Sequence, residues 1–279
     1  MAGWPPDPPD RRVPAPRARY WAGVAITVVA IVSQYFVPVL LPASLVVYGS
    51  LPGDLAVVYG IPVVAFLGLV GTAPLRHGTA RLRTATWEGL RWYGGLSVLA
   101  IVLVVLTVIA YSVAAPQVLH QFETTPNPAL ASAQSDPWLY VGLSFVVGAF
   151  EETIFRGWIF GYWRDVGGSW FGPAVWTSVV FAGVHLYYGI AYGAASPLVY
   201  PTLFLLGFSF AATYRYSGGN LVVPALLHGE NDATAYLTLV DPTVAVLLHY
   251  LVILVGLVIA AVAYFDPRPA AGRSGPPAG

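Results

Sequence analysis

Residues 92–115, WYGGLSVLAIVLVVLTVIAYSVAA, form a long run without a single charged side chain. A helix of about 20 such residues spans the hydrocarbon core of a bilayer. Comparable runs predict further spans at 20–42, 55–73, 137–161, 170–189, 198–216, 220–238 and 243–265. The pattern therefore predicts an all-α, polytopic membrane helix bundle of about eight transmembrane helices. The proline-containing stretch from Phe36 to Tyr48 leaves seven or nine spans open.

The composition agrees with a membrane protein and excludes several other classes. Of 279 residues, 57% are hydrophobic and 9% are charged, whereas soluble domains carry roughly 25% charged residues. The formal net charge is zero, so the chain lacks the basic excess of a nucleic-acid-binding protein. It contains no cysteine, which excludes disulfides, cysteine-ligated metals and a thiol nucleophile.

The two ends of the chain differ from the rest. Residues 1–18 and 266–279 are rich in proline, glycine and charge, and they have too little apolar surface to pack. We expect both to be disordered tails around a transmembrane domain at 19–265, with a motif-bearing core at about 137–238. The first apolar run is too long and too far from the N-terminus for a cleavable signal peptide, so it is interpreted as the first span.

Arginine placement gives an independent prediction of topology. All basic residues are arginines, and only Arg156 lies in the interior of a predicted span. Arg215 ends the sixth span, and the others lie before the first span, in alternate loops or after the eighth: Arg11, Arg12, Arg17, Arg19, Arg76, Arg81, Arg83, Arg91, Arg164, Arg268 and Arg273. The opposite loops contain Asp54, Glu123, Asp136 and Asp241 and no arginine. By the positive-inside rule, both termini are expected in the cytoplasm of a multi-pass cell-membrane protein.

Ionisable residues inside a membrane are costly and often functional, and here they concentrate in the C-terminal half. The fourth predicted span contains Glu151, Glu152 and Arg156. Glu152 and Arg156 are four residues apart, the spacing of a pair on one helix face. Glu151 is rotated by about 100° from Glu152, so we expect it to face the bundle interior as a candidate general base. A buried salt-bridge cluster of purely structural role is the alternative.

Two further spans carry histidines with polar or aromatic neighbours. His185 follows Phe181 by one helical turn, and His228 precedes Asn231 and Asp232 by about one turn. A carboxylate at that spacing could orient the imidazole of His228 and select its tautomer. Counted from interfacial landmarks, Glu151, His185 and His228 could meet at middle depth. His249, which has no polar partner at helical spacing, is interpreted as structurally incidental.

The ordered set of motifs resembles one known family. The segments are EETIFR at 151–156, FAGVH at 181–185 and the His228 segment. They are similar to the Glu-Glu-x-x-x-Arg, Phe-x-x-x-His and His-x-x-x-Asn motifs of the CPBP family. This is the family of CAAX-processing and bacteriocin-processing (Abi-type) intramembrane endopeptidases. The resemblance covers about 150–235, whereas residues 1–136 match only as generic membrane helices.

The resemblance implies roles for these residues in peptide hydrolysis. Glu151 and His185 would activate the attacking water, supported by Glu152 and Arg156. His228 and the polar residue one turn later would stabilise the oxyanion, a charge that enzymes commonly meet with preorganised donors.

The fourth residue after His228 is Asp232, where the family has asparagine, and an ionised aspartate cannot donate a hydrogen bond. Either Asp232 orients His228, or it stays protonated, or Asn231 is the donor.

The sequence leaves the cofactor and the biological role open. We expect no cofactor; the alternative is a zinc ion held by Glu151, His185 and His228, since two histidines and a carboxylate are a known catalytic zinc shell. The expected partners are the lipid bilayer and a peptide or membrane-protein substrate, not nucleic acid. A non-catalytic scaffold or self-protection protein of the same fold, and a proton-coupled transporter, are the other functions considered. The arginine-only, alanine-rich composition favours a prokaryotic source, and oligomeric state is not predicted.

Overall fold

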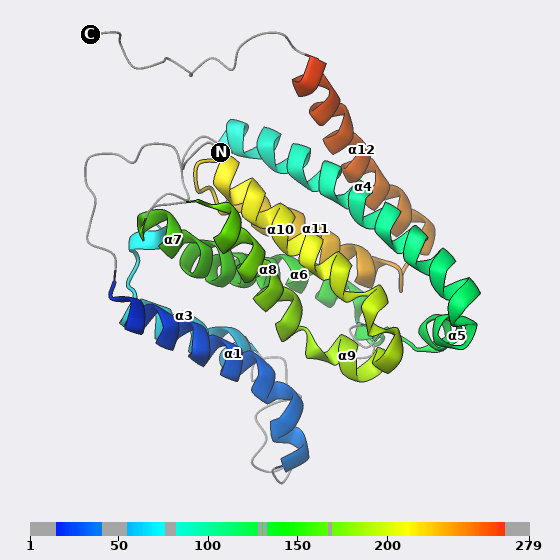
Figure 1. Ribbon diagram of the computed structural model, residues 1–279, viewed down its shortest axis with the longest axis horizontal. Helices are drawn as coiled ribbons and strands as arrows, with labels where there is room; N and C mark the ends of the chain where they lie inside the picture. Colours follow the sequence, from blue (N-terminus) through cyan, green and yellow to red (C-terminus); the bar gives the residue numbers. More distant parts are fainter. Residues whose placement is uncertain are drawn as a thin grey trace.

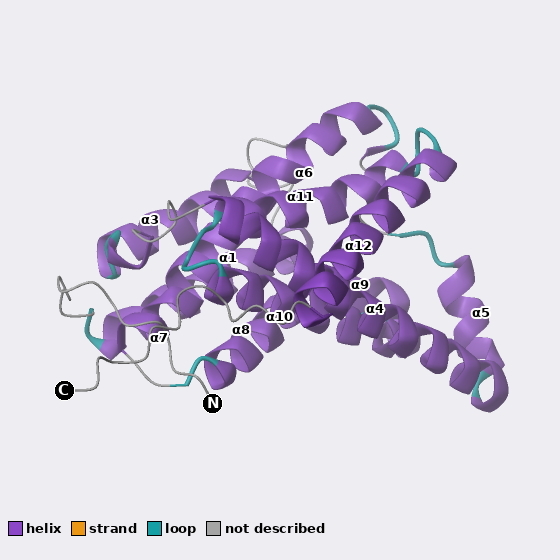
Figure 2. Cartoon of the chain, turned by 90° about the horizontal axis from the view of Figure 1, so that it is seen from above, coloured by secondary structure: helices purple, strands orange, loops and turns teal. Residues whose placement is uncertain are grey.

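The computed structural model describes residues 15–40, 55–75, 82–127, 130, 133–166 and 169–265. Within these residues the chain is helical and contains no strand (Figure 2). The predicted tails, except residues 15–18, and the loop residues Asp54, Arg76 and Arg81 lie outside the described residues.

The N-terminal helical segments are α1 (Arg17–Leu40), η2 (Leu55–Gly60), α3 (Ile61–Leu69), η3 (Ala73–Leu75), α4 (Leu82–Ala114) and α5 (Pro116–Thr124). The C-terminal segments are α6 (Pro137–Glu152), η5 (Thr153–Phe160), α7 (Gly161–Val166), α8 (Phe171–Val184), α9 (Leu186–Tyr192), η6 (Gly193–Leu198), α10 (Tyr200–Tyr216), α11 (Val222–Leu237) and α12 (Pro242–Phe265).

Each predicted span contains a described helix, but fewer helices qualify as membrane-crossing. Three are long and apolar enough among the described residues: Ala85–Ala114, Pro137–Trp163 and Pro242–Val262. A fourth is added if Phe171–Val184 and Leu186–Leu198, which are bent by 51°, form one broken span. The helices α10 and α11 have 17 and 16 residues, which is short for a full crossing. The all-helical class is confirmed, whereas eight spans and cytoplasmic termini stay predictions.

Close helix contacts are made through glycine. Helix α6 packs along α11, and α12 packs along α4 (Figure 1). A Cβ added at Gly148 of α6 would lie 2.8 Å from the backbone nitrogen of Gly229 in α11. A Cβ added at Gly94 of α4 would lie 2.8 Å from the Cα of Gly256 in α12. Small residues of this kind let helix backbones approach closely where apolar lipid gives little drive for association.

The N-terminal helices α1 and α3 lie side by side (Figure 1) and are fastened to the segment that carries Arg156. The hydroxyl of Tyr20 donates to the carbonyl of Ile159 at 3.1 Å, and the indole nitrogen of Trp158 donates to the carbonyl of Gly71 at 2.8 Å. Gly71 has a φ of 79°, a conformation that glycine adopts without a Cβ clash. The ring of Phe66 stacks on Trp158. These contacts fix the N-terminal pair on the motif-bearing half.

A polar network surrounds Glu230 of α11, one residue after Gly229. The carboxylate of Glu230 accepts hydrogen bonds from Tyr93 of α4 at 3.0 Å and from Thr234 at 3.2 Å. Its Oε1 also lies 3.2 Å from Nδ1 of His249 in α12. The interpretation of His249 as structurally incidental is therefore wrong: its partner is on another helix, where spacing within one helix could not reveal it.

Candidate active site

The most buried part of the site is an ion-pair network around Glu152, at the last residue of α6. Its Oε1 accepts a hydrogen bond from Nη1 of Arg156 at 2.8 Å, and Nδ1 of His228 lies 2.8 Å from the same oxygen. The exposed fractions of Glu152, Arg156 and His228 are 0%, 1% and 2%. The predicted pairing of Glu152 with Arg156 is confirmed. Glu152 thus holds Nδ1 of the His228 ring, a contact that the sequence did not predict, and Asp232 lies on the side of Nε2.

The guanidinium of Arg156 connects this network to two other helices. Its Nη2 donates to the carbonyl of Gly207 in α10 at 2.8 Å. The guanidinium carbon lies 4.6 Å from the ring centre of Phe181 in α8 and 5.3 Å from that of Phe210 in α10. Arginine is suited to this position because its planar group both donates several hydrogen bonds and packs on aromatic faces. Arg156 therefore fixes α8 and α10 around the glutamates.

Arg156 lies in the π-helical segment η5, Thr153–Phe160, which continues α6 directly. Short π-helical stretches inside α-helices occur frequently at functional sites. Every residue of this segment from Ile154 to Phe160 is buried. The segment therefore places the guanidinium in the protein interior.

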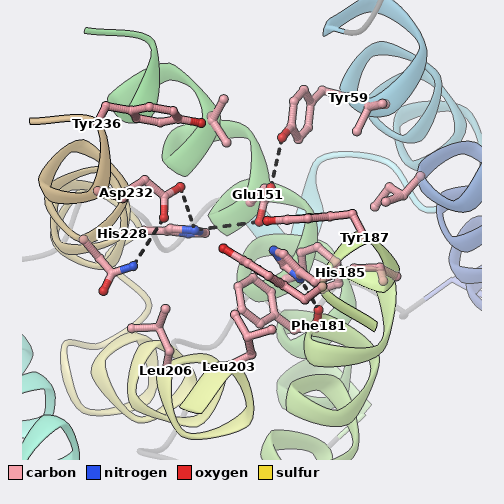
Figure 3. Close-up of a pocket in the computed structure, with 18 residues that line it drawn as sticks. Tyr59, Glu151, Phe181, His185, Tyr187, Leu203, Leu206, His228, Asp232 and Tyr236 are labelled. Atoms are coloured by element: carbon pink, nitrogen blue, oxygen red, sulfur yellow. Dashed lines mark hydrogen bonds and ion pairs between the residues drawn. The ribbon is translucent and has the colours of Figure 1, made fainter. Parts of the chain in front are cut away.

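Glu151 lines a cavity in the bundle interior, on the Nε2 side of His228 (Figure 3). Its Oε1 accepts a hydrogen bond from the hydroxyl of Tyr59 at 3.0 Å. Its Oε2 lies 3.8 Å from Nε2 of His228 and has no hydrogen-bond partner among the described residues. A buried carboxylate oxygen without a partner is energetically unfavourable. Oε2 of Glu152 also lacks a partner among the described residues, but only Glu151 lines the cavity, where its oxygen is placed to bind water or substrate.

His185 lies at the break between α8 and α9, not inside the continuous helix that was predicted for 170–189. Its Nδ1 is 2.6 Å from the carbonyl oxygen of Phe181. A carbonyl can only accept, so Nδ1 carries the proton, and in the neutral imidazole Nε2 keeps its lone pair. The rings of Phe181 and His185 also contact each other. The predicted contact with Phe181 is thus confirmed, and it leaves Nε2 as a possible proton acceptor.

The polar residues that follow His228 both line the cavity. Oδ2 of Asp232 lies 3.5 Å from Nε2 of His228, so Asp232 faces the ring nitrogen that Glu152 does not hold. The amide of Asn231 donates to Oδ1 of Asp232 at 3.3 Å. The side chain of Asp232 is 30% exposed, and that of Glu151 is 12% exposed. The fourth position after His228 is therefore occupied by Asp232, whose carboxylate accepts a hydrogen bond from the side-chain amide of Asn231.

Glu151, His185 and His228 line one cavity of about 390 Å³, together with Asn231 and Asp232 (Figure 3). Four tyrosines that the sequence analysis did not identify also line it: Tyr59, Tyr187, Tyr188 and Tyr236. Tyr59 comes from η2, far from the motifs, so no spacing in the sequence pointed to it. Tyr187 and Tyr188 lie two and three residues after His185, which was an available but weak signal.

A larger and mainly apolar cavity of about 530 Å³ adjoins the first one. The two share Tyr188, Leu203, Leu206 and Asn231, and the second extends between α4, α10 and α12. The cavity lined by the polar site residues therefore adjoins a mainly apolar cavity.

The described residues were also considered as metal ligands. Among them, no group of three histidine or acidic side chains is placed to hold a metal ion together. The alternative zinc set of Glu151, His185 and His228 shares the cavity but does not form a ligand cluster in this structure.

Comparison with known proteins identifies the motif-bearing region. Residues 133–234 match the family model described as type II CAAX prenyl endopeptidase, Rce1-like. This region belongs to the CAAX protease family. It covers less than half of the 279 residues but includes all three motifs, and it confirms the resemblance stated from them. No curated protein and no solved structure matches the chain.

The family match and the apolar helices together indicate a membrane protein, and the family points to a protease. Tyr59, Tyr93 and His249 lie outside the matched region.

Proposed function

We propose that the protein is a multi-pass intramembrane endopeptidase that hydrolyses peptide bonds of membrane-associated substrates with glutamate- and histidine-activated water. The observation that carries this proposal is the convergence of Glu151, His185 and His228 on one cavity, with Oε2 of Glu151 facing His228 and lacking a hydrogen-bond partner among the described residues. A peptide-hydrolysing site needs a base for water and donors for the developing negative charge. This set of side chains offers both.

The reaction would proceed by general acid–base catalysis. Glu151 takes a proton from water, assisted by Nε2 of His185, while the water oxygen forms a bond to the peptide carbonyl carbon. His228, in its doubly protonated form, donates from Nε2 to the oxyanion. The C–N bond then breaks, the leaving amine receives the proton from Glu151, and a carboxylate and an amine are released.

The supporting residues would have separate tasks in this scheme. Glu152 and Arg156 hold His228 and do not contact the substrate, because both are buried behind it. Asp232, supported by Asn231, would stabilise the cationic form of His228. The adjoining apolar cavity would receive apolar groups of the substrate next to the bond that is cleaved.

The test is cleavage of reporter peptides by the purified protein in proteoliposomes. The reporters are fluorogenic membrane-anchored peptides, with and without a prenylated C-terminal cysteine. We expect cleavage by the wild-type protein and none by Glu151→Gln or His185→Ala. Glu123→Gln and His120→Ala, which change exposed residues of α5, are matched controls and should remain active.

A wild-type protein that binds such peptides without cleaving them would contradict the proposal and favour the scaffold function. We propose further that no metal is needed, so activity should persist after exhaustive chelation. Activity lost on chelation and restored by zinc would support the zinc alternative instead.

For topology, we propose that both termini are cytoplasmic. Because the chain has no native cysteine, single cysteines introduced at Gly3 and Ala278 can be tested with a membrane-impermeant thiol reagent. Both should be protected in intact cells and labelled after lysis.

A further inference from the structure

The two oxygens of the Glu151 carboxylate have different environments. Oε1 accepts the hydrogen bond of Tyr59 at 3.0 Å. Oε2 has no hydrogen-bond partner among the described residues and lies 3.8 Å from Nε2 of His228 (Figure 3). The terminal torsion of a glutamate is broad and roughly two-fold, so an unrestrained carboxylate would exchange its oxygens freely. The hydrogen bond from Tyr59 determines which oxygen faces the tyrosine and which faces His228.

The position of Tyr59 is fixed by packing that is independent of this hydrogen bond. Its ring stacks on Phe150 with the centres 5.7 Å apart and the planes 18° from parallel. Phe150 immediately precedes Glu151 in α6, so the tyrosine follows any movement of the carboxylate's own helix.

The backbone that carries Tyr59 is also held in place. Its segment η2 runs directly into α3, and Phe66 of α3 stacks on Trp158 with the planes 6° from parallel. Trp158 in turn donates to the carbonyl of Gly71, just after α3. The hydroxyl of Tyr59 is thus presented to Glu151 by a fixed scaffold and does not depend on a flexible loop.

We propose that Tyr59 is a positioning residue of the active site: it holds Oε1 of Glu151, so that Oε2 is the oxygen that takes the proton from water. This inference rests on the proposed function. It assigns a role to the N-terminal half of the chain, which lies outside the family match and contains none of the motifs.

The test compares Tyr59→Phe with a matched control. Tyr59→Phe removes only the hydroxyl and keeps the ring on Phe150. Tyr216→Phe removes a hydroxyl from a tyrosine of α10 that lines neither cavity. Peptide cleavage is measured in proteoliposomes, and kcat and KM are determined separately.

We expect Tyr59→Phe to lower kcat by roughly 10-fold or more, the factor that corresponds to one hydrogen bond to a charged group, with KM within about two-fold of wild type. Tyr216→Phe should retain the kcat of the wild type. Tyr59→Phe should unfold at a somewhat lower temperature than Tyr216→Phe, because it loses a hydrogen bond to a carboxylate, so kcat is determined per folded protein. A purely structural role would lower the unfolding temperature of Tyr59→Phe and leave the kcat of the folded fraction unchanged.

The outcomes separate this inference from the proposed function. If the wild type cleaves, Glu151→Gln does not, and Tyr59→Phe has the kcat of Tyr216→Phe, then the positioning role is refuted and the protease function stands. If Tyr59→Phe changes KM alone, the tyrosine contacts substrate and the positioning role is again refuted. If the wild type cleaves no reporter, the proposed function itself fails.

Discussion

Replacing Gly148 with alanine is expected to separate α6 from α11 and to lower both stability and activity. The added Cβ would lie 2.8 Å from the nitrogen of Gly229, 2.9 Å from the carbonyl oxygen of Ala225 and 3.3 Å from the Cα of Gly229. All three atoms belong to the backbone of α11, so no side-chain rotation can relieve the contact. The helices must therefore move apart by several tenths of an ångström to reach the 3.4–4 Å of ordinary contact.

The magnitude follows from two opposing effects. Overpacking of this kind costs about 1–3 kcal/mol, and the better helix propensity of alanine returns about 0.5–1 kcal/mol. We expect a net loss of about 1–2 kcal/mol in the free energy of unfolding. The movement also affects the site, because Gly229 directly follows His228, whose Nδ1 lies only 2.8 Å from Glu152. Small misplacements in an active site can cost up to about 100-fold in rate, so kcat should fall by at least about 10-fold.

The control is Gly142→Ala on the same helix, where an added Cβ has nothing within 4 Å. It should raise the free energy of unfolding by about 0.5–1 kcal/mol through helix propensity alone and leave peptide cleavage unchanged. Both variants are measured by reversible unfolding in mixed micelles with increasing SDS, and by the reporter-peptide assay. Equal stability and equal activity of the two variants would refute the close-packing argument.

Two other parts of the structure give predictions of stability. Arg156→Met should lower the free energy of unfolding by about 3–5 kcal/mol, since it leaves a buried carboxylate without its cation. Adding Glu152→Gln should recover part of that loss, and a double-mutant cycle in SDS unfolding that shows no coupling would contradict the buried pair. His249→Leu should cost about 1 kcal/mol, as expected for one hydrogen bond, and Glu230→Gln should cost a similar amount. In the double variant of these two residues the losses should not add, and full additivity would show that His249 and Glu230 do not interact.

The sequence predicted the helical class, and the pairing of Glu152 with Arg156, because both depend on local patterns. The apolar runs gave the helices, and the four-residue spacing gave the pairing of Glu152 with Arg156. Contacts between helices were harder to predict, since spacing within one segment carries no information about a residue 76 positions away, such as His228 from Glu152. Tyr59 was missed for the same reason.

The break at His185 was also not predicted. Residues 170–189 contain no proline after Pro173 and no charge, so their hydropathy resembles that of one continuous helix. The bend depends on the backbone at His185, where φ is −82° and ψ is 45°. The contacts that hold it come from other helices, among them the hydroxyl of Tyr200, 3.5 Å from the His185 carbonyl oxygen.

Helix α11 has polar partners on two sides, and they determine its register in the bundle. His228 is held by Glu152 of α6, and Glu230, two residues later, is held by Tyr93 of α4 and His249 of α12. Apolar side chains in lipid lose little when one helix slides past another by a residue, because lipid is as apolar as its neighbours. A slide or a rotation of α11 by one residue would break both sets of polar contacts at once. The helix that carries His228 is thus constrained to a single alignment against three others, which keeps this histidine at a fixed position in a fluid bilayer.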